Sequence, residues 1–368
     1  MARAGHDLSR EAGQIIIGGF DGDRVPPDFE DAIARGIVGG AILFSRNLRS
    51  IEQTAALVQH LSGLPAPAPL WLAVDQEGGR VQRLRAPFPE LPPMRRVGEL
   101  GREALAADVG TLLGSCLGLL GFHQDYAPVL DVDTNPANPV IGDRSFARDP
   151  EAVGRFGAAL IGAMQATGVA ACGKHFPGHG DTSQDSHLEL PRLDHDLARL
   201  QAVELVPFRR AVEVGVAALM TAHVLFPALD ADHPATLSDR IIRPILRDQL
   251  GYDGVVVSDD LEMKAITHHY GIGDAAVRAV RAGCDQLLVC HTLALQVEAH
   301  EALIHAVERG LLPAERLAEA ARRVAVMKGR YAVPRWRPAP REVVAHFPAD
   351  LAARVTAALG TALPGVSV

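Results

Sequence analysis

The chain has 368 residues, of which 48% are hydrophobic and 22% are charged, a balance that excludes a largely disordered protein. Its 36 basic and 44 acidic residues give a formal net charge of −8. Because the charges are scattered rather than gathered in a basic stripe, we expect no nucleic-acid partner.

No apolar run in the sequence has the character of a signal peptide or of a membrane span. The first residues lack a stretch of signal-peptide length. The longest charge-free run, residues 156–173, contains Gln165, Thr167 and four glycines, so we expect no membrane span. The four cysteines show no CxxC spacing, which predicts buried thiols in a cytoplasmic protein.

Eight short apolar runs alternate with segments of helical periodicity. Several runs are apolar almost throughout, as is typical of strands covered on both faces. The expected strands are 14–18, 40–44, 71–74, 124–130, 169–173, 217–221, 254–258 and 286–290. The helical patterns are 28–35, 51–61, 99–120, 151–167, 196–215, 238–250, 273–282, 293–309 and 314–328.

Eight strand–helix units predict a closed (β/α)8 barrel of the TIM type, forming a single catalytic domain over residues 1–332. A doubly wound open sheet is the alternative. The first strand is followed by GGFDG, which matches a dinucleotide site only weakly, and we expect no cofactor. Residues 333–368 begin with a proline-rich segment, and 342–359 has the pattern of one more helix, so we expect a tail rather than a separate domain.

Polar and charged residues directly follow six of the expected strands. Active sites of these barrels lie at the carboxyl ends of the strands. Asp260 alone could be a helix cap, but convergence from six strand ends favours an active site. The segments are 75–83, 131–133 with 142–146, 174–181, 221–223, 258–260 and His291.

A connection of about 20 residues follows the fifth strand, a length typical of functional loops. Its Gly178 and Gly180 suggest mobility. Within it, the Asp185 carboxylate can accept the Nδ1–H of His187 and leave Nε2 for proton transfer. His175, His179 and His187 could instead bind zinc, but they lie among glycines and prolines beside Lys174, so we expect no metal.

The run 174–187, KHFPGHGDTSQDSH, resembles the signature of family 3 glycoside hydrolases in the β-N-acetylhexosaminidase branch. Residues 75–83 (DQEGGRVQR) and 258–263 (SDDLEM) resemble two further motifs of that branch, in the family's order. By pattern the chain is most similar to bacterial β-N-acetylglucosaminidases of cell-wall recycling.

The resemblance implies a retaining, two-step mechanism with Asp259 as the nucleophile. Strand alternation predicts that Asp259 and Asp260 do not both face the barrel mouth. The resemblance also implies His187 as the general acid/base, with Asp185 as its partner. The residues after the eighth strand are too few for a second α/β domain, so the acid/base should come from the barrel or a partner chain. The positions expected to hold the sugar are Asp75, Arg83, Arg144, Lys174 and His175, and His223 is expected to line the site.

The expected partner is a small carbohydrate, either a muropeptide or a chito-oligosaccharide with a terminal β-linked N-acetylglucosamine. Two alternatives stay open. A histidine acid/base is neutral after the first step and does not repel phosphate, so phosphorolysis is conceivable. A non-catalytic sugar-binding protein would have to lack Asp259, Asp185 or His187, and all three are present. If Asp185 and His187 are only structural, Glu77 or His179 is the next candidate acid.

Overall fold

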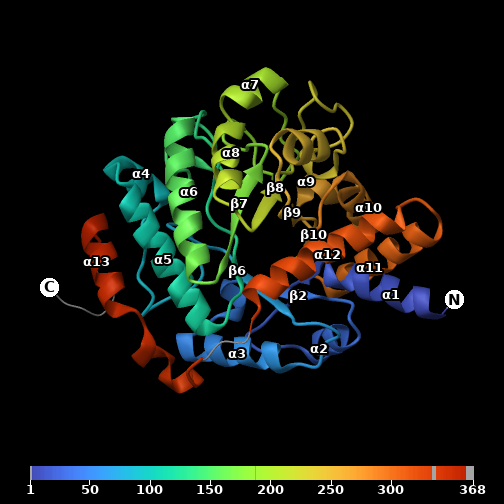
Figure 1. Cartoon of the computed structure of the whole chain (residues 1–368), viewed down its shortest axis with the longest axis horizontal. Coiled ribbons are helices and arrows are strands. Elements are labelled where there is room, and N and C mark those ends of the chain that lie inside the picture. Colours follow the sequence, from blue (N-terminus) through green and yellow to red (C-terminus); the bar gives the residue numbers. More distant parts are fainter. Residues whose placement is uncertain (1, 187, 334–336, 362–368) are drawn as a thin grey trace.

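A computed structural model of the chain describes residues 2–186, 188–333 and 337–361. Eight parallel strands close into a barrel whose members follow one another in chain order (Figure 1). The barrel strands are β1 (Ile16–Gly18), β2 (Gly40–Leu43), β3 (Trp71–Val74), β6 (Gln124–Asp125), β7 (Ala170–Phe176), β8 (Ala218–Thr221), β9 (Val255–Asp260) and β10 (Gln286–Val289). The predicted (β/α)8 fold is confirmed, and the open-sheet alternative is wrong.

Each predicted strand coincides with a barrel strand, but β6 is much shorter than 124–130. Pro128 has no N–H to donate to a neighbouring strand, and beyond it Val129 makes only an isolated bridge with Lys174. A two-stranded hairpin of β4 (Gln76–Gly78) and β5 (Val81–Gln82) follows β3.

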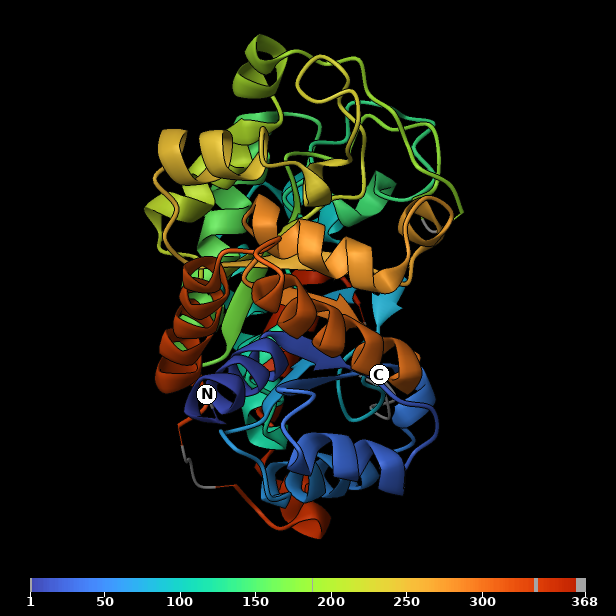
Figure 2. The same cartoon turned by 90° about the vertical axis from the view of Figure 1, so that its right-hand side faces the viewer.

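Helices surround the barrel and mostly match the predicted segments. The pattern 99–120 is broken because Gly101 adopts a left-handed conformation, φ 67°, which ends a helix. The N-terminal helix was not predicted, and it packs against α11 and α12 (Figures 1 and 2). The helices are α1 (Ala2–Gln14), α2 (Pro27–Ala34), α3 (Ile51–Gly63), α4 (Met94–Leu100), α5 (Glu103–Leu120), α6 (Pro150–Ala166), α7 (Leu197–Ala202), α8 (Leu205–Glu213), α9 (Lys264–Thr267), α10 (Ile272–Ala282), α11 (Leu293–Glu308), α12 (Ala314–Tyr331) and α13 (Ala349–Leu359), with a π-helix, η4 (Ile242–Gln249), between β8 and β9.

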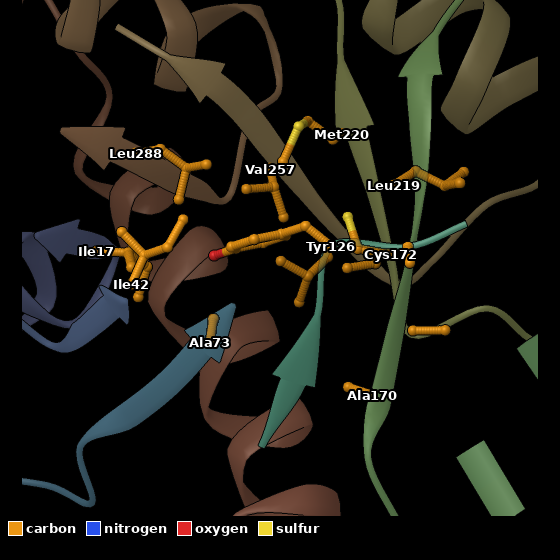
Figure 3. Close-up of a cluster of buried hydrophobic side chains, with 14 of the residues drawn as sticks. Ile17, Ile42, Ala73, Tyr126, Ala170, Cys172, Leu219, Met220, Val257 and Leu288 are labelled. Carbon is orange, nitrogen blue, oxygen red and sulfur yellow. The ribbon is translucent and has the colours of Figure 1, made fainter. Parts of the chain in front are cut away.

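Buried side chains fill the inside of the barrel. Ile17, Ile42, Tyr126, Met220 and Leu288 lie close together there (Figure 3). The barrel interior is therefore a packed core rather than a pore. All four cysteines, which lie in the described part of the chain, are buried and free, as predicted.

Among the described residues, α5 has the length and hydropathy of a membrane span, but 56% of it is buried inside the protein. It packs closely against α6, and Leu112, Leu113 and Leu117 are fully buried. The apolar composition of α5 is therefore explained by its packing as a helix of the protein core.

The C-terminal segment lies against the outside of the barrel. A 3₁₀ helix, η5 (Pro340–His346), packs on α3, and α13 packs on α5 (Figure 1). The single helix predicted over 342–359 is interrupted at Phe347, because the residue before a proline disfavours helical backbone. Val343 and Val355 are buried by this packing.

Lys328 of α12 is a buried cation that joins three segments. Its Nζ donates to Gln14 Oε1 at 2.7 Å and to the Gly39 carbonyl at 2.8 Å. Burial lowers the pKa of Lys328 from 10.5 to about 7. Between pH 7 and pH 10.5, therefore, Lys328 carries a proton in the unfolded chain but not in the folded chain.

We therefore expect the free energy of unfolding of the wild type to rise, relative to that of Lys328→Met, by about 1 kcal/mol per pH unit above neutrality. Urea denaturation of both proteins between pH 7 and pH 9.5 measures this difference. The comparison is needed because the buried cysteines, whose pKa values are raised, act in the opposite direction in both proteins. A difference that is flat or falls with pH contradicts the prediction.

Candidate active site

The carboxyl ends of the strands surround a cavity of about 450 Å³. Tyr126, Met220 and Leu288 of the barrel core form part of its wall, so the cavity is closed towards the barrel interior. Six residues predicted for the site line this cavity: Asp75, Arg83, Arg144, Lys174, His175 and Asp259. The prediction that residues after the strands share one site therefore holds for side chains that lie up to 184 positions apart in the sequence.

A cluster of opposite charges forms one wall of the cavity. Lys174 Nζ lies 2.8 Å from Asp75 Oδ1 and 2.6 Å from Glu77 Oε1. Arg144 donates two parallel hydrogen bonds to Glu77, at 2.9 and 2.8 Å. Arg83 Nη2 lies 3.7 Å from Asp75 Oδ2. Carboxylates and cations held in this way can accept from and donate to the hydroxyl groups of a ligand.

Glu77 was not predicted as a member of this cluster, and its environment keeps it ionised. Burial alone would raise its pKa, but the charges of Arg144 and Lys174 and their hydrogen bonds lower it well below the ordinary value. In turn, Asp75 and Glu77 raise the pKa of Lys174 against the effect of burial. Glu77 therefore has no proton to donate at neutral pH.

Asp131, six residues after the end of β6, holds the end of β7 and the loop that follows it against the barrel. It accepts from His175 Nδ1 at 2.7 Å and from the His179 backbone N–H at 2.7 Å. A Cβ atom at Gly180 would lie 1.7 Å from the Val132 carbonyl oxygen. Gly180 is thus required by a close approach of two backbones, and its presence is no sign of mobility.

His179 is buried and bound on both ring nitrogens. Nδ1 lies 2.8 Å from Thr182 Oγ1, and Nε2 lies 3.0 Å from Ser186 Oγ. Burial and the neighbouring His175 lower the pKa of His179 to about 4, so the ring is neutral at neutral pH. It is therefore unsuited to act as the general acid.

The loop after β7 reaches the cavity at Ser186, which directly follows the predicted site residue Asp185. Ser186 is buried and lines the cavity, and Asp185 is half-buried beside it. His187, the predicted acid/base, lies outside the described residues.

Asp259 and Asp260 end β9, and both line the cavity. The prediction that only one faces the mouth is wrong, because the β9–β10 register shifts: Val257 pairs with Gln286, but Asp260 pairs with Leu288. The extra residue on β9 breaks the alternation, as in a β-bulge.

The two aspartates differ in their contacts. Asp260 Oδ1 accepts from the backbone N–H groups of Glu262 and Cys290, at 3.1 and 3.2 Å, and Oδ2 lies 3.2 Å from His291 Nε2. Asp259 Oδ1 accepts from the Asp260 backbone N–H at 2.8 Å. Asp260 is thus tied to the ends of β9 and β10, whereas Asp259 is oriented by its neighbour's backbone.

His223 does not form part of the cavity wall, contrary to the prediction. It is fully buried, with Nδ1 2.8 Å from Thr236 Oγ1 and Nε2 3.0 Å from the Asp260 carbonyl oxygen. Its ring therefore lies between Thr236 and the end of β9, with one ring nitrogen bonded to each.

Phe44, Met263 and Lys264 also line the cavity, although the sequence analysis assigned them no role. The ring of Phe44 stacks on that of His291, a predicted strand-end residue, with centroids 5.5 Å apart. Phe44 directly follows β2, so the rule that located the other site residues could also have found it.

A closed parallel barrel whose strand-end cavity holds a carboxylate of β9 together with a fixed charged cluster defines a glycoside hydrolase of the (β/α)8 class. The Glycosyl hydrolase family 3 N terminal domain matches residues 9–327. The chain belongs to glycosyl hydrolase family 3, which confirms the resemblance seen in the sequence.

Similar proteins support this membership. A β-hexosaminidase of Thiobacillus denitrificans is 48% identical over 261 residues, covering 69% of this chain and 72% of the relative. A family 3 β-N-acetylglucosaminidase structure from Paenibacillus sp. has a TM-score of 0.88 and 41% identity, and covers 95% of this chain and 68% of that chain. The structure of NagZ from Neisseria gonorrhoeae with N-trifluoroacetyl-D-glucosamine has a TM-score of 0.77 and 34% identity, and covers 94% of this chain and 98% of that chain.

Proposed function

We propose that this enzyme is a retaining exo-β-N-acetylglucosaminidase that acts in the cytoplasm and removes terminal β-linked N-acetylglucosamine from peptidoglycan-derived muropeptides. The observation that carries the proposal is that Asp259 shares one cavity with the paired charges of Asp75, Glu77, Arg144 and Lys174. The names of the similar proteins favour N-acetylhexosamine as the sugar.

In this proposal each group of residues has a separate task. Asp259 is the nucleophile, and His187, oriented by Asp185, is the general acid/base. Low pKa values remove the two other candidate acids at neutral pH, since Glu77 stays ionised and His179 stays neutral. The residues that hold the sugar are Asp75, Arg83, Arg144, Lys174 and His175.

The reaction then proceeds in two displacements. In the first, the Asp259 carboxylate attacks the anomeric carbon while the His187 imidazolium gives its proton to the departing oxygen. In the second, the neutral imidazole takes a proton from water, and the water oxygen displaces Asp259 from the same carbon. Two displacements at one carbon return the β configuration.

Hydrolysis of 4-nitrophenyl β-N-acetylglucosaminide tests the proposal, with the corresponding β-glucoside as the control that lacks the acetamido group. We expect release of nitrophenol from the first compound only, and β-configured N-acetylglucosamine as the initial product by NMR. In phosphate buffer we expect free sugar; accumulation of sugar 1-phosphate would establish a phosphorylase instead. If neither compound is hydrolysed, the proposal is overturned and a non-catalytic sugar-binding protein is the alternative.

The dyad gives a prediction that depends on the leaving group. General acid/base groups contribute about 10²–10⁴-fold to rate, and a good leaving group needs little protonation. His187→Ala should therefore slow hydrolysis of chitobiose most, and should accumulate glycosyl-enzyme with the nitrophenyl substrate. Asp185→Ala should have the same effect in weaker form, because the imidazole remains.

Steady-state kinetics on both substrates measure this, with azide added to restore the second step in the alanine variant. Ser183→Ala, an exposed position in the same loop, is the control. Near wild-type rates on chitobiose for both dyad variants contradict the assignment.

A further inference from the structure

His223 is linked to the carboxylate of Asp259 by the backbone of Asp260. His223 Nε2 lies 3.0 Å from the Asp260 carbonyl oxygen, and the Asp260 N–H donates to Asp259 Oδ1 at 2.8 Å. His223 itself is fully buried and away from the cavity. The hydrogen bond that His223 makes towards the site is thus to residue 260.

The contacts of the ring define its protonation. A carbonyl oxygen only accepts hydrogen bonds, so His223 Nε2 carries a proton. Burial lowers the pKa of His223, so the ring is neutral and Nδ1 is the acceptor. The single proton of the Thr236 hydroxyl has two acceptors within reach, His223 Nδ1 at 2.8 Å and the Ala222 carbonyl oxygen at 3.0 Å. The same hydroxyl accepts from the Thr221 hydroxyl at 2.9 Å.

Residue 260 is held from two sides. On the β10 side its carboxylate accepts from the Cys290 N–H and faces His291. On the β8 side its carbonyl accepts from His223, and the same oxygen accepts from the Met263 backbone N–H at 3.0 Å. A residue fixed at both its side chain and its carbonyl presents its N–H in one direction, and that N–H is the group that meets Asp259 Oδ1.

We propose that His223 is a positioning residue for Asp259: by donating to the Asp260 carbonyl it fixes the backbone N–H that orients the nucleophilic carboxylate. This inference rests on the proposed role of Asp259. His223 touches no substrate, and it differs in this from the residues that hold the sugar.

A loosened nucleophile slows both displacements, because Asp259 takes part in each. The loss should therefore be the same for good and poor leaving groups, unlike the loss in His187→Ala. Misplacement of a reacting group by about 1 Å costs about 100-fold in rate. The charged cluster that holds the sugar is not altered, so KM should stay within about two-fold.

The test compares His223→Leu, which cannot donate, with His223→Gln, whose side-chain amide can donate to the same carbonyl. We expect kcat to fall about 100-fold in the leucine variant on both chitobiose and the nitrophenyl substrate, and to be largely restored in the glutamine variant. The rate of labelling by a 5-fluoro glycosyl reagent should fall in parallel. Thr236→Val, which removes the donor to Nδ1, should give a smaller loss in the same sense.

A matched control is available in His300, another buried histidine, whose Nε2 lies 3.0 Å from the Ser9 carbonyl oxygen. His300→Leu should lower the melting temperature as much as His223→Leu while leaving kcat near the wild-type value. Crystal structures of the two His223 variants give a readout that does not depend on activity. The contact between the Asp260 N–H and Asp259 Oδ1 should be lost with leucine and kept with glutamine.

Folded His223→Leu with wild-type kcat, or with an unchanged contact at Asp259, would overturn the proposal. So would a loss confined to poor leaving groups, since that is the behaviour of an acid/base defect. A wild type that hydrolyses no N-acetylhexosaminide would instead overturn the proposed function, and the crystal structures would still decide whether His223 positions Asp259.

Discussion

Asp259→Asn should reduce kcat by roughly four orders of magnitude and leave the fold intact. An amide is not a nucleophile towards the anomeric carbon, so the glycosyl-enzyme cannot form. The amide oxygen can still accept the Asp260 N–H, which now bonds Oδ1 at 2.8 Å. The local backbone should therefore be unchanged, and the melting temperature should stay near that of the wild type.

Asp260→Asn is the matched control, because the residue is adjacent and lines the same cavity. Its Oδ1 would still accept from the Glu262 and Cys290 N–H groups, so the chemical step should be affected much less. A 5-fluoro glycosyl reagent followed by peptide mapping identifies the residue that forms the covalent bond. Labelling at Asp260 would contradict the assignment.

Glu77→Gln should destabilise the protein by about 3–5 kcal/mol, as expected when one partner is removed from a buried ion cluster. Arg144 and Lys174 would then be left with Asp75 as the anion of the described cluster. Activity should fall at least about ten-fold as these cations shift. Denaturation in urea and kcat/KM on the nitrophenyl substrate measure the two effects.

The pH dependence gives this prediction a second readout. The folded chain lowers the pKa of Glu77 below 4.5, so its stabilisation is fully present above that value and is lost as the pH falls below it. The free energy of unfolding should therefore fall less steeply with decreasing pH in Glu77→Gln than in the wild type. The control is Glu99→Gln, which removes an exposed pair with Arg96 at 3.8 Å and should change stability by less than about 1 kcal/mol. Equal effects of the two substitutions would contradict the prediction.

The sequence predicted the barrel because its strands are buried on both faces and read as continuous apolar runs. The site followed from one geometric rule, that residues after the strands share one end of the barrel. That rule located Asp75, Lys174 and Asp259 without any knowledge of distances.

The rest depends on contacts between distant segments. The direction of the Asp260 side chain follows from a one-residue register shift between β9 and β10, which no local pattern reports. His223 was expected at the cavity because it follows β8, but its ring is turned towards Thr236 and the Asp260 carbonyl. The charge state of Glu77 depends on Arg144, 67 positions further along the chain.

The charges that line the cavity nearly cancel. The carboxylates are those of Asp75, Glu77, Asp259, Asp260 and Glu262, and the cations are Arg83, Arg144, Lys174 and Lys264. A set of groups whose charges nearly cancel has little long-range field, so it attracts a ligand only weakly by its charge. Selection of the sugar in such a site comes from the directions of individual donors and acceptors, and ionic strength should have little influence on affinity for an uncharged glycoside.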